Sequence, residues 1–149
     1  MTDAAYIAFD PGETYGYCTF DENGIELSMG QFRFEESAQH LSRLIVPTLK
    51  LVICEDYKNH GWKQQKKWSR NQTSKEIGKI EMTCDLRGVK YVLQSNTVKS
   101  IGHRWAGRPE GAPSNHSISH QFDANAHGVY YLQSAGIRAA GIAIPEEDR

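Results

Sequence analysis

The sequence lacks any apolar run close to the roughly 18 residues that a membrane-spanning helix needs. Its beginning, Met1-Thr2-Asp3, also lacks the basic and apolar regions of a secretory signal peptide. These two absences predict a cytoplasmic, intracellular protein that has no membrane partner.

Cysteine is scarce, and the spacing of Cys18, Cys54 and Cys84 matches no zinc-binding module. Their odd number argues against a disulfide framework. Buried structural cysteines are usually inert, so we expect three buried, reduced thiols. Hydrophobic residues make up 39% of the 149-residue chain, which predicts one globular α/β domain spanning residues 1–149.

An excess of charge of either sign is missing too, because the formal net charge is −1 at pH 7. The charges are distributed unevenly, however, and residues 58–70 contain no acidic residue. Basic side chains neutralise phosphates and aromatic faces stack on unpaired bases, so this block predicts a nucleic-acid surface, although core packing is the alternative role of the tryptophans. The predicted DNA-binding residues of the block are Lys58, Trp62, Lys63, Lys66, Lys67, Trp68 and Arg70.

The beginning of the chain predicts three antiparallel strands joined by short turns. Residues 4–10 form an apolar strand that ends at Asp10, and Pro11-Gly12 turns the chain into a second strand, residues 15–20. A third strand follows over 25–34. Asp10 would be held rigidly at the end of a buried strand, where a metal ligand is well placed; simple turn chemistry is the alternative.

A helix predicted over 35–46 ends at Pro47 and leads to a second buried strand, residues 49–54, followed by Glu55. A strand reached through a helical crossover runs parallel to its neighbour. If that neighbour is the first strand, Glu55 and Asp10 emerge side by side at one edge of the sheet.

The second half predicts a helix over 73–87 that begins with a Thr73–Glu76 capping box, and a fifth strand over 89–93. Residues 94–108 are polar and basic, 117–133 form a long helix, and 137–144 form a short edge segment.

The long helix carries His120, Asp123 and His127 on one stripe, which faces either water or a metal. Three carboxylates from Asp10, Glu55 and Asp123 would repel one another in one place unless cations neutralised them. Oxygen ligands with imidazole favour Mg²⁺ or Mn²⁺, and two such ions about 4 Å apart can clamp a phosphodiester.

These motifs resemble those of the RuvC-type Holliday-junction resolvases, which belong to the RNase H-like superfamily. The resemblance extends from about residue 6 to residue 132. It is carried by Ile7-Ala8-Phe9-Asp10-Pro11-Gly12, by Val52-Ile53-Cys54-Glu55, and by the segment from His120 to His127.

The resemblance implies an RNase H-like fold with a five-stranded mixed sheet flanked by helices. It also implies that Asp10, Glu55 and Asp123 are catalytic ligands of two Mg²⁺ or Mn²⁺ ions. The fourth ligand would be His120, one turn before the last aspartate, or His127, which completes an Asp-Ala-x-x-His motif and is slightly preferred.

The implied substrate is branched DNA, the four-way junction, which a homodimer would cut. The helix predicted over 73–87 is the candidate dimer interface, although its apolar stripe could equally pack in the core of its own chain. Lys99 would contact the scissile phosphate or face solvent, and Arg104 would join it in binding DNA. One alternative is an RNase H-like nuclease for RNA–DNA hybrids or flaps, and another is a module that binds junctions without cutting them. The loop Asp10-x-Gly12-x-Thr14 also resembles a phosphate loop of actin-like ATPases, but the chain is too short for their two lobes, so we expect no nucleotide cofactor.

Overall fold

The computed structural model describes residues 3–56, 70–113 and 117–140, with only the backbone of Arg70. Five strands form one mixed sheet in the order β3-β2-β1-β4-β5. The first three strands are antiparallel neighbours, and β4 and β5 run parallel to β1. The predicted five-stranded mixed sheet is therefore confirmed. The strands are β1 (Tyr6–Asp10), β2 (Thr14–Phe20), β3 (Glu26–Arg33), β4 (Leu51–Asp56) and β5 (Tyr91–Ser95).

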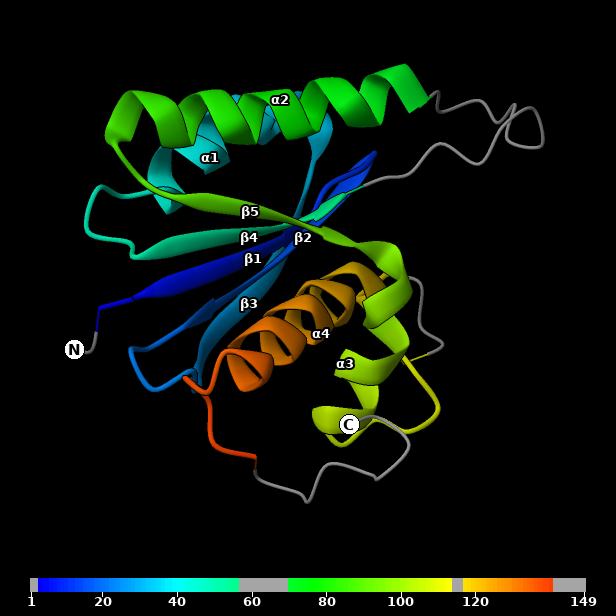
Figure 1. The fold of residues 1–149 in the computed structure, drawn as a ribbon. Coiled ribbons are helices and arrows are strands. Elements are labelled where there is room, and N and C mark those ends of the chain that lie inside the picture. Colours follow the sequence, from blue (N-terminus) through cyan, green and yellow to red (C-terminus); the bar gives the residue numbers. More distant parts are fainter. Residues whose placement is uncertain (1–2, 57–69, 114–116, 141–149) are drawn as a thin grey trace.

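Helices cover both faces of the sheet (Figure 1). On one face lie α1 (Ser37–Leu44), preceded by the 3-10 helix η1 (Phe34–Glu36), and α2 (Arg70–Arg87). On the other face lie α4 (Ser119–Ser134) and α3 (Lys99–Trp105), which follows the 3-10 helix η3 (Asn96–Val98). No helix among the described residues is both long and apolar enough to cross a membrane.

The alternation of side chains along β1 and β4 assigns each residue to one of two cores. Ile7 and Phe9 pack in the core beneath α1 and α2, whereas Ala8 packs in the core beneath α4. In β4, Cys54 belongs to the first core and Ile53 to the second. Asp10 and Glu55 continue this alternation, so the backbone directs both carboxylates toward the α4 side.

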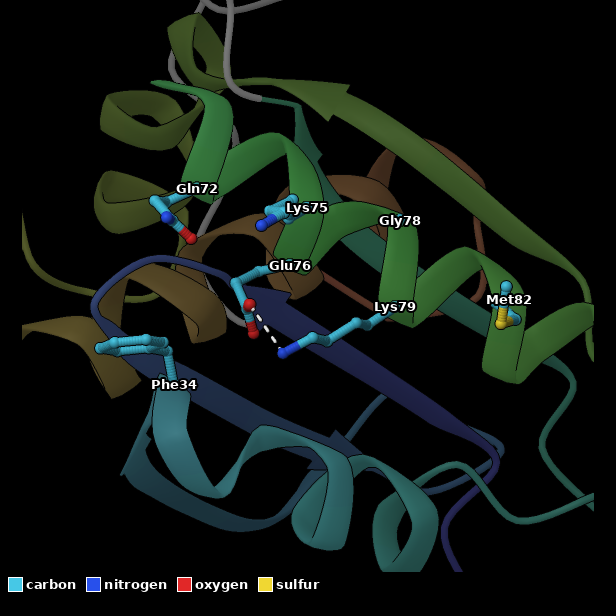
Figure 2. Close-up of a pocket in the computed structure, with 7 residues that line it drawn as sticks. All are labelled: Phe34, Gln72, Lys75, Glu76, Gly78, Lys79 and Met82. Carbon is cyan, nitrogen blue, oxygen red and sulfur yellow. Dashed lines mark ion pairs between the residues drawn. The ribbon is translucent and has the colours of Figure 1, made fainter. Parts of the chain in front are cut away.

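A buried carboxylate holds α2 against the sheet on the opposite face. Glu76 is only 2% exposed, and its Oε1 accepts a hydrogen bond of 2.8 Å from the hydroxyl of Tyr15 in β2. Its Oε2 pairs with Lys79 at 2.9 Å, as Figure 2 shows, and Lys79 also donates to the hydroxyl of Ser37 in α1. This carboxylate therefore connects both helices of this layer to β2.

The position of Glu76 corrects the predicted start of α2. The Thr73–Glu76 spacing predicted a capping box, but α2 already begins at Arg70, so both residues lie inside the helix. The apolar stripe of the same helix, including Ile77 and Ile80, is buried in the core of its own chain.

The stretch 94–108 folds into more regular structure than its polar composition predicts. It contains the end of β5, η3 and α3, and α3 lies close against α4 because Gly102 has no side chain. A Cβ atom on Gly102 would overlap the backbone of Ala126. Of the edge segment predicted over 137–144, residues 137–140 form no strand, and residues 141–144 lie outside the described residues.

Candidate metal centre

Two of the predicted carboxylates lie on neighbouring parallel strands. Asp10 ends β1, and Glu55 lies one residue beyond the last paired residues of β1 and β4, Phe9 and Cys54. Asp10 is 6% exposed and Glu55 is 7% exposed. The parallel crossover thus brings the two carboxylates to one edge of the sheet.

The third carboxylate comes from α4, whose beginning is fixed by two residues of the meander. Gly16 pairs with Asp10, and a Cβ atom at Gly16 would overlap the backbone of His120 and Gln121. The missing side chain lets α4 approach β2 closely. Gln31 of β3 accepts a 3.0 Å hydrogen bond from the backbone N–H of Gln121, and its amide nitrogen donates to the carbonyl of residue 117. Gln31 therefore caps a helix that has no cap of its own.

This arrangement brings three donor groups together at the beginning of α4. Ligand atoms of Asp10, His120 and Asp123 all lie within 4.8 Å of one another. His120 Nδ1 is 3.3 Å from Asp10 Oδ2. Of the three, Asp10 is buried, and the other two are half-buried, so the group is open to solvent on one side.

Among the residues that the structure describes, Lys99 is the lysine that reaches the carboxylates. Its Nζ lies 3.4 Å from Glu55 Oε1 and 3.6 Å from Asp123 Oδ2. Its side chain is 31% exposed. Burial alone would lower the pKa of Lys99, but the carboxylates of Glu55, Asp10 and Asp123 outweigh burial and raise it. The ammonium group thus partly neutralises the three acids and links Glu55 to Asp123.

Within the described part of the chain, the charge of Lys99 does not compensate three carboxylates, and the pKa values of Asp10 and Glu55 reflect this. Burial raises the pKa of Asp10 well above its ordinary value, and repulsion from Glu55 raises it further. Burial alone would also raise the pKa of Glu55, but a hydrogen bond from Asp10, the neighbouring His127 and the charge of Lys99 lower it below its usual range. When the pair takes up a proton, these opposite shifts place it on Asp10 rather than on Glu55.

His127, the slightly preferred fourth ligand, lies deeper than His120. It is fully buried, and its Nδ1 accepts a hydrogen bond of 2.9 Å from the side-chain amide of Gln94. The same amide nitrogen donates to the backbone carbonyl of His127, which fixes the amide orientation. Nε2 consequently carries the ring proton and lies 3.4 Å from Glu55 Oε1, although it makes no well-formed hydrogen bond there. Among the described residues, the group that could hold a metal ion contains His120, whereas His127 lies behind Glu55.

A second buried histidine, His103 of α3, lies behind Asp123. Its Nε2 is 2.8 Å from Asp123 Oδ1, and its Nδ1 accepts a hydrogen bond of 3.0 Å from Arg108 Nε. In the sequence, His103 and Gln94 belong to a polar, basic stretch that predicts no role for either residue. Only the crossing of α3 and α4 puts His103 next to Asp123.

The cluster fits a hard divalent cation. Carboxylate oxygens with one imidazole are ligands that suit Mg²⁺ and Mn²⁺. The raised pKa of Asp10 shows a site that is short of positive charge, which such an ion would supply. The described cysteines do not contribute, because all three are free and buried as expected, and burial raises the pKa of Cys18 to about 12.

Most of the predicted DNA-binding residues lie outside the described residues. These are Lys58, Trp62, Lys63, Lys66, Lys67 and Trp68, and the side chain of Arg70 is likewise not described. Of the remaining two, Lys99 lies in the carboxylate cluster, and Arg104 is half-buried on α3.

Comparison of the whole chain with known proteins shows what fold carries this cluster. No family model matches the sequence, and no curated protein does so either. Among solved structures, RuvC of Thermus thermophilus superposes with a TM-score of 0.62 and 13% sequence identity, covering 89% of this chain and 96% of that one. This chain has the RNase H-like fold of RuvC. A structure of T. thermophilus RuvC in complex with a Holliday junction substrate gives a TM-score of 0.55 at 12% identity, with the same coverage of both chains.

Proposed function

We propose that this protein is a divalent-metal-dependent endonuclease that cuts Holliday junctions and related branched DNA, leaving a 5′-phosphate and a 3′-hydroxyl. The observation that carries this proposal is the convergence of Asp10, His120 and Asp123 within 4.8 Å beside Glu55. The RuvC fold supports it, because a RuvC structure contains a Holliday junction substrate.

In this proposal each ligand has a distinct role. Asp10, Glu55 and Asp123 would hold the two ions through their carboxylates, and His120 would add an imidazole nitrogen to this set. Bound Mg²⁺ or Mn²⁺ supplies the Lewis acidity that phosphodiester hydrolysis requires. Lys99, once its ammonium group is released from Glu55 and Asp123, is placed to bind the scissile phosphate.

We also propose that the protein acts as a homodimer. The apolar stripe of α2 is buried in its own core, so it does not supply the interface. The outer surface of the same helix exposes two large apolar side chains one turn apart, Met82 at 64% and Leu86 at 81%. A second copy that covers them would give an enzyme with two sites for a junction with twofold symmetry. Light scattering on the wild type and on Leu86→Glu tests this, and a wild-type protein that is monomeric at assay concentrations would contradict it.

Cleavage of a synthetic four-way junction tests the function itself. We expect nicking in Mg²⁺ or Mn²⁺ and none in chelator. Asp10→Asn should bind the junction and leave it intact, while Asp3→Asn, the same change at an exposed residue, should cut like the wild type. The panel includes a flap and an RNA–DNA hybrid. Preference for the hybrid, or cleavage by Asp10→Asn, would contradict the proposal.

A further inference from the structure

The hydrogen bonds of His103 define which of its nitrogens carries a proton. Arg108 Nε lies 3.0 Å from His103 Nδ1, and a guanidinium group can only donate hydrogen bonds. Nδ1 must therefore be the acceptor, so the neutral ring carries its proton on Nε2. That proton points at Asp123 Oδ1, 2.8 Å away.

The backbone places Arg108 where it can do this. After α3 the chain makes a Schellman turn: the N–H of Gly107 bonds the carbonyl of Arg104, and the N–H of Arg108 bonds the carbonyl of His103. Gly107 has a φ of +87°, which the turn requires. The turn folds the chain back, so that the Arg108 side chain reaches the imidazole of His103 from the far side.

Arg108 is fixed to α4 as well as to α3. Its Nη2 donates to the Asn125 side-chain oxygen at 2.6 Å and to the carbonyl of Phe122 at 3.2 Å. Its guanidinium carbon also lies 5.1 Å from the centre of the Phe122 ring. Phe122 and Asn125 lie one and two positions from Asp123 on α4. They therefore hold the arginine that orients His103 close to Asp123.

We propose that Arg108 and His103 are positioning residues that orient Asp123 as a metal ligand. The bond from His103 occupies Oδ1 and leaves Oδ2, the oxygen that faces Lys99, for a cation. His103 is 4% exposed, so water does not compete for this bond. The inference rests on the proposed function for the identity of the ligand, but the tautomer and the orientation are properties of the metal-free protein.

The first test is nitrogen NMR of the histidine rings in metal-free protein at neutral pH. His103 is assigned by its loss in His103→Gln. We expect a proton on Nε2 and none on Nδ1 in the wild type, and a less defined tautomer in Arg108→Met. A proton on Nδ1 of the wild-type ring would overturn the proposal, whether or not the protein binds metal or cuts DNA.

The second test is Mn²⁺ affinity by calorimetry, after melting curves in chelator show which variants fold. His103→Leu should bind Mn²⁺ about 10–100-fold more weakly, as expected when the partner of a ligand is lost. His103→Gln keeps an N–H donor and should recover most of the affinity. The control is His40→Leu in α1, on the opposite face of the sheet, which should bind as the wild type does.

Each outcome has a definite meaning. Folded His103→Leu with wild-type affinity, or His103→Gln as weak as His103→Leu, would overturn the positioning role. If His103→Leu does not fold, His103→Gln and the NMR result decide. A wild-type protein that binds no Mn²⁺ would instead overturn the proposed function. The NMR measurement of the His103 tautomer would remain valid, because it is made on metal-free protein.

Discussion

Replacing Asp10 with asparagine should stabilise the metal-free protein while destroying its response to metal. In the absence of a cation, Asp10 is a buried carboxyl beside Glu55, and burial and that repulsion raise its pKa. Asparagine has nearly the same shape, carries no charge, and keeps an N–H that can donate to Glu55. The variant therefore removes an electrostatic cost and retains the packing.

The sign of the pH dependence follows from the raised pKa of Asp10. Between its ordinary value of 3.8 and the raised value, Asp10 binds more proton in the folded protein than in the unfolded chain. The contribution of Asp10 to the free energy of unfolding must then fall as the pH rises through this window. The stability gain of Asp10→Asn should be absent below about pH 4, where aspartate is protonated in both states, and should grow as the pH rises through this window.

The size of the gain depends on the width of that window. Each unit of pKa shift corresponds to about 1.4 kcal/mol, which for a domain of this length changes the melting temperature by about 3–6 °C. Added Mn²⁺ should act in the opposite direction, because a ligand at about 100 times its Kd stabilises the wild type by about 2.7 kcal/mol. Asp10→Asn should lose that increment.

Melting curves in chelator and in Mn²⁺, measured from pH 3.5 to pH 8, test both effects. The control is Asp3→Asn, which makes the same chemical change at an exposed position. If Asp10→Asn melts below the wild type in chelator at pH 8, the carboxylates do not repel one another in the folded protein. If it still gains stability from Mn²⁺, Asp10 is not a principal ligand. Either result would refute the reasoning.

Two further predictions concern the packing around the cluster and around α2. Gly16→Ala should lower the free energy of unfolding by about 1–3 kcal/mol and weaken Mn²⁺ binding, because the added methyl group meets the backbone of His120. Gly78→Ala is the matched control: its methyl group points into open space on α2, so it should raise the free energy of unfolding by about 0.5–1 kcal/mol. Chemical denaturation measures both, and an unchanged Gly16→Ala would contradict the close approach of α4. Glu76→Ala should lower the free energy of unfolding by about 2–4 kcal/mol, because it leaves the buried Tyr15 hydroxyl without its carboxylate acceptor. Its Mn²⁺ binding should stay as in the wild type. A loss below 0.5 kcal/mol, about the size of an ordinary surface change, would show that this carboxylate does not hold the layer together.

The sheet and the positions of Asp10 and Glu55 could be predicted because they depend on strong, local rules. Alternating and continuous apolar runs identify strands, and a helical crossover between two of them implies that they are parallel. These rules permit β4 to pair with β1, which would place Asp10 and Glu55 side by side, and the structure shows that pairing. The resemblance to RuvC, drawn from a few short motifs, is confirmed as a likeness of fold.

The choice between His120 and His127 could not be made in this way. Both lie on one stripe of the same helix, and they differ by seven residues, or about 10 Å along the axis. In the folded protein both rings reach the edge carboxylates, His120 at 3.3 Å from Asp10 and His127 at 3.4 Å from Glu55. The two rings differ because the amide of Gln94, which is distant in sequence, donates to Nδ1 of His127. No pattern within the helix contains that information.

The same limitation applies to α3 and to the start of α2. The Lys99–Trp105 helix is short and polar, so its sequence shows no apolar period, and its packing depends on Gly102 against α4. Thr73 and Glu76 have the spacing of a cap, but the carboxylate of Glu76 has a buried partner in Tyr15, 61 residues away. Contacts of this range override local propensity.

The most direct test of the account is a crystal structure of the protein soaked in Mn²⁺, with anomalous scattering used to locate the ion. The account predicts a peak within bonding distance of carboxylate oxygens from both Asp10 and Asp123, with Lys99 displaced from them. A map with no peak between Asp10 and Asp123 in fully loaded crystals, or with Mn²⁺ only elsewhere on the molecule, would contradict the claim that these acids form a metal centre.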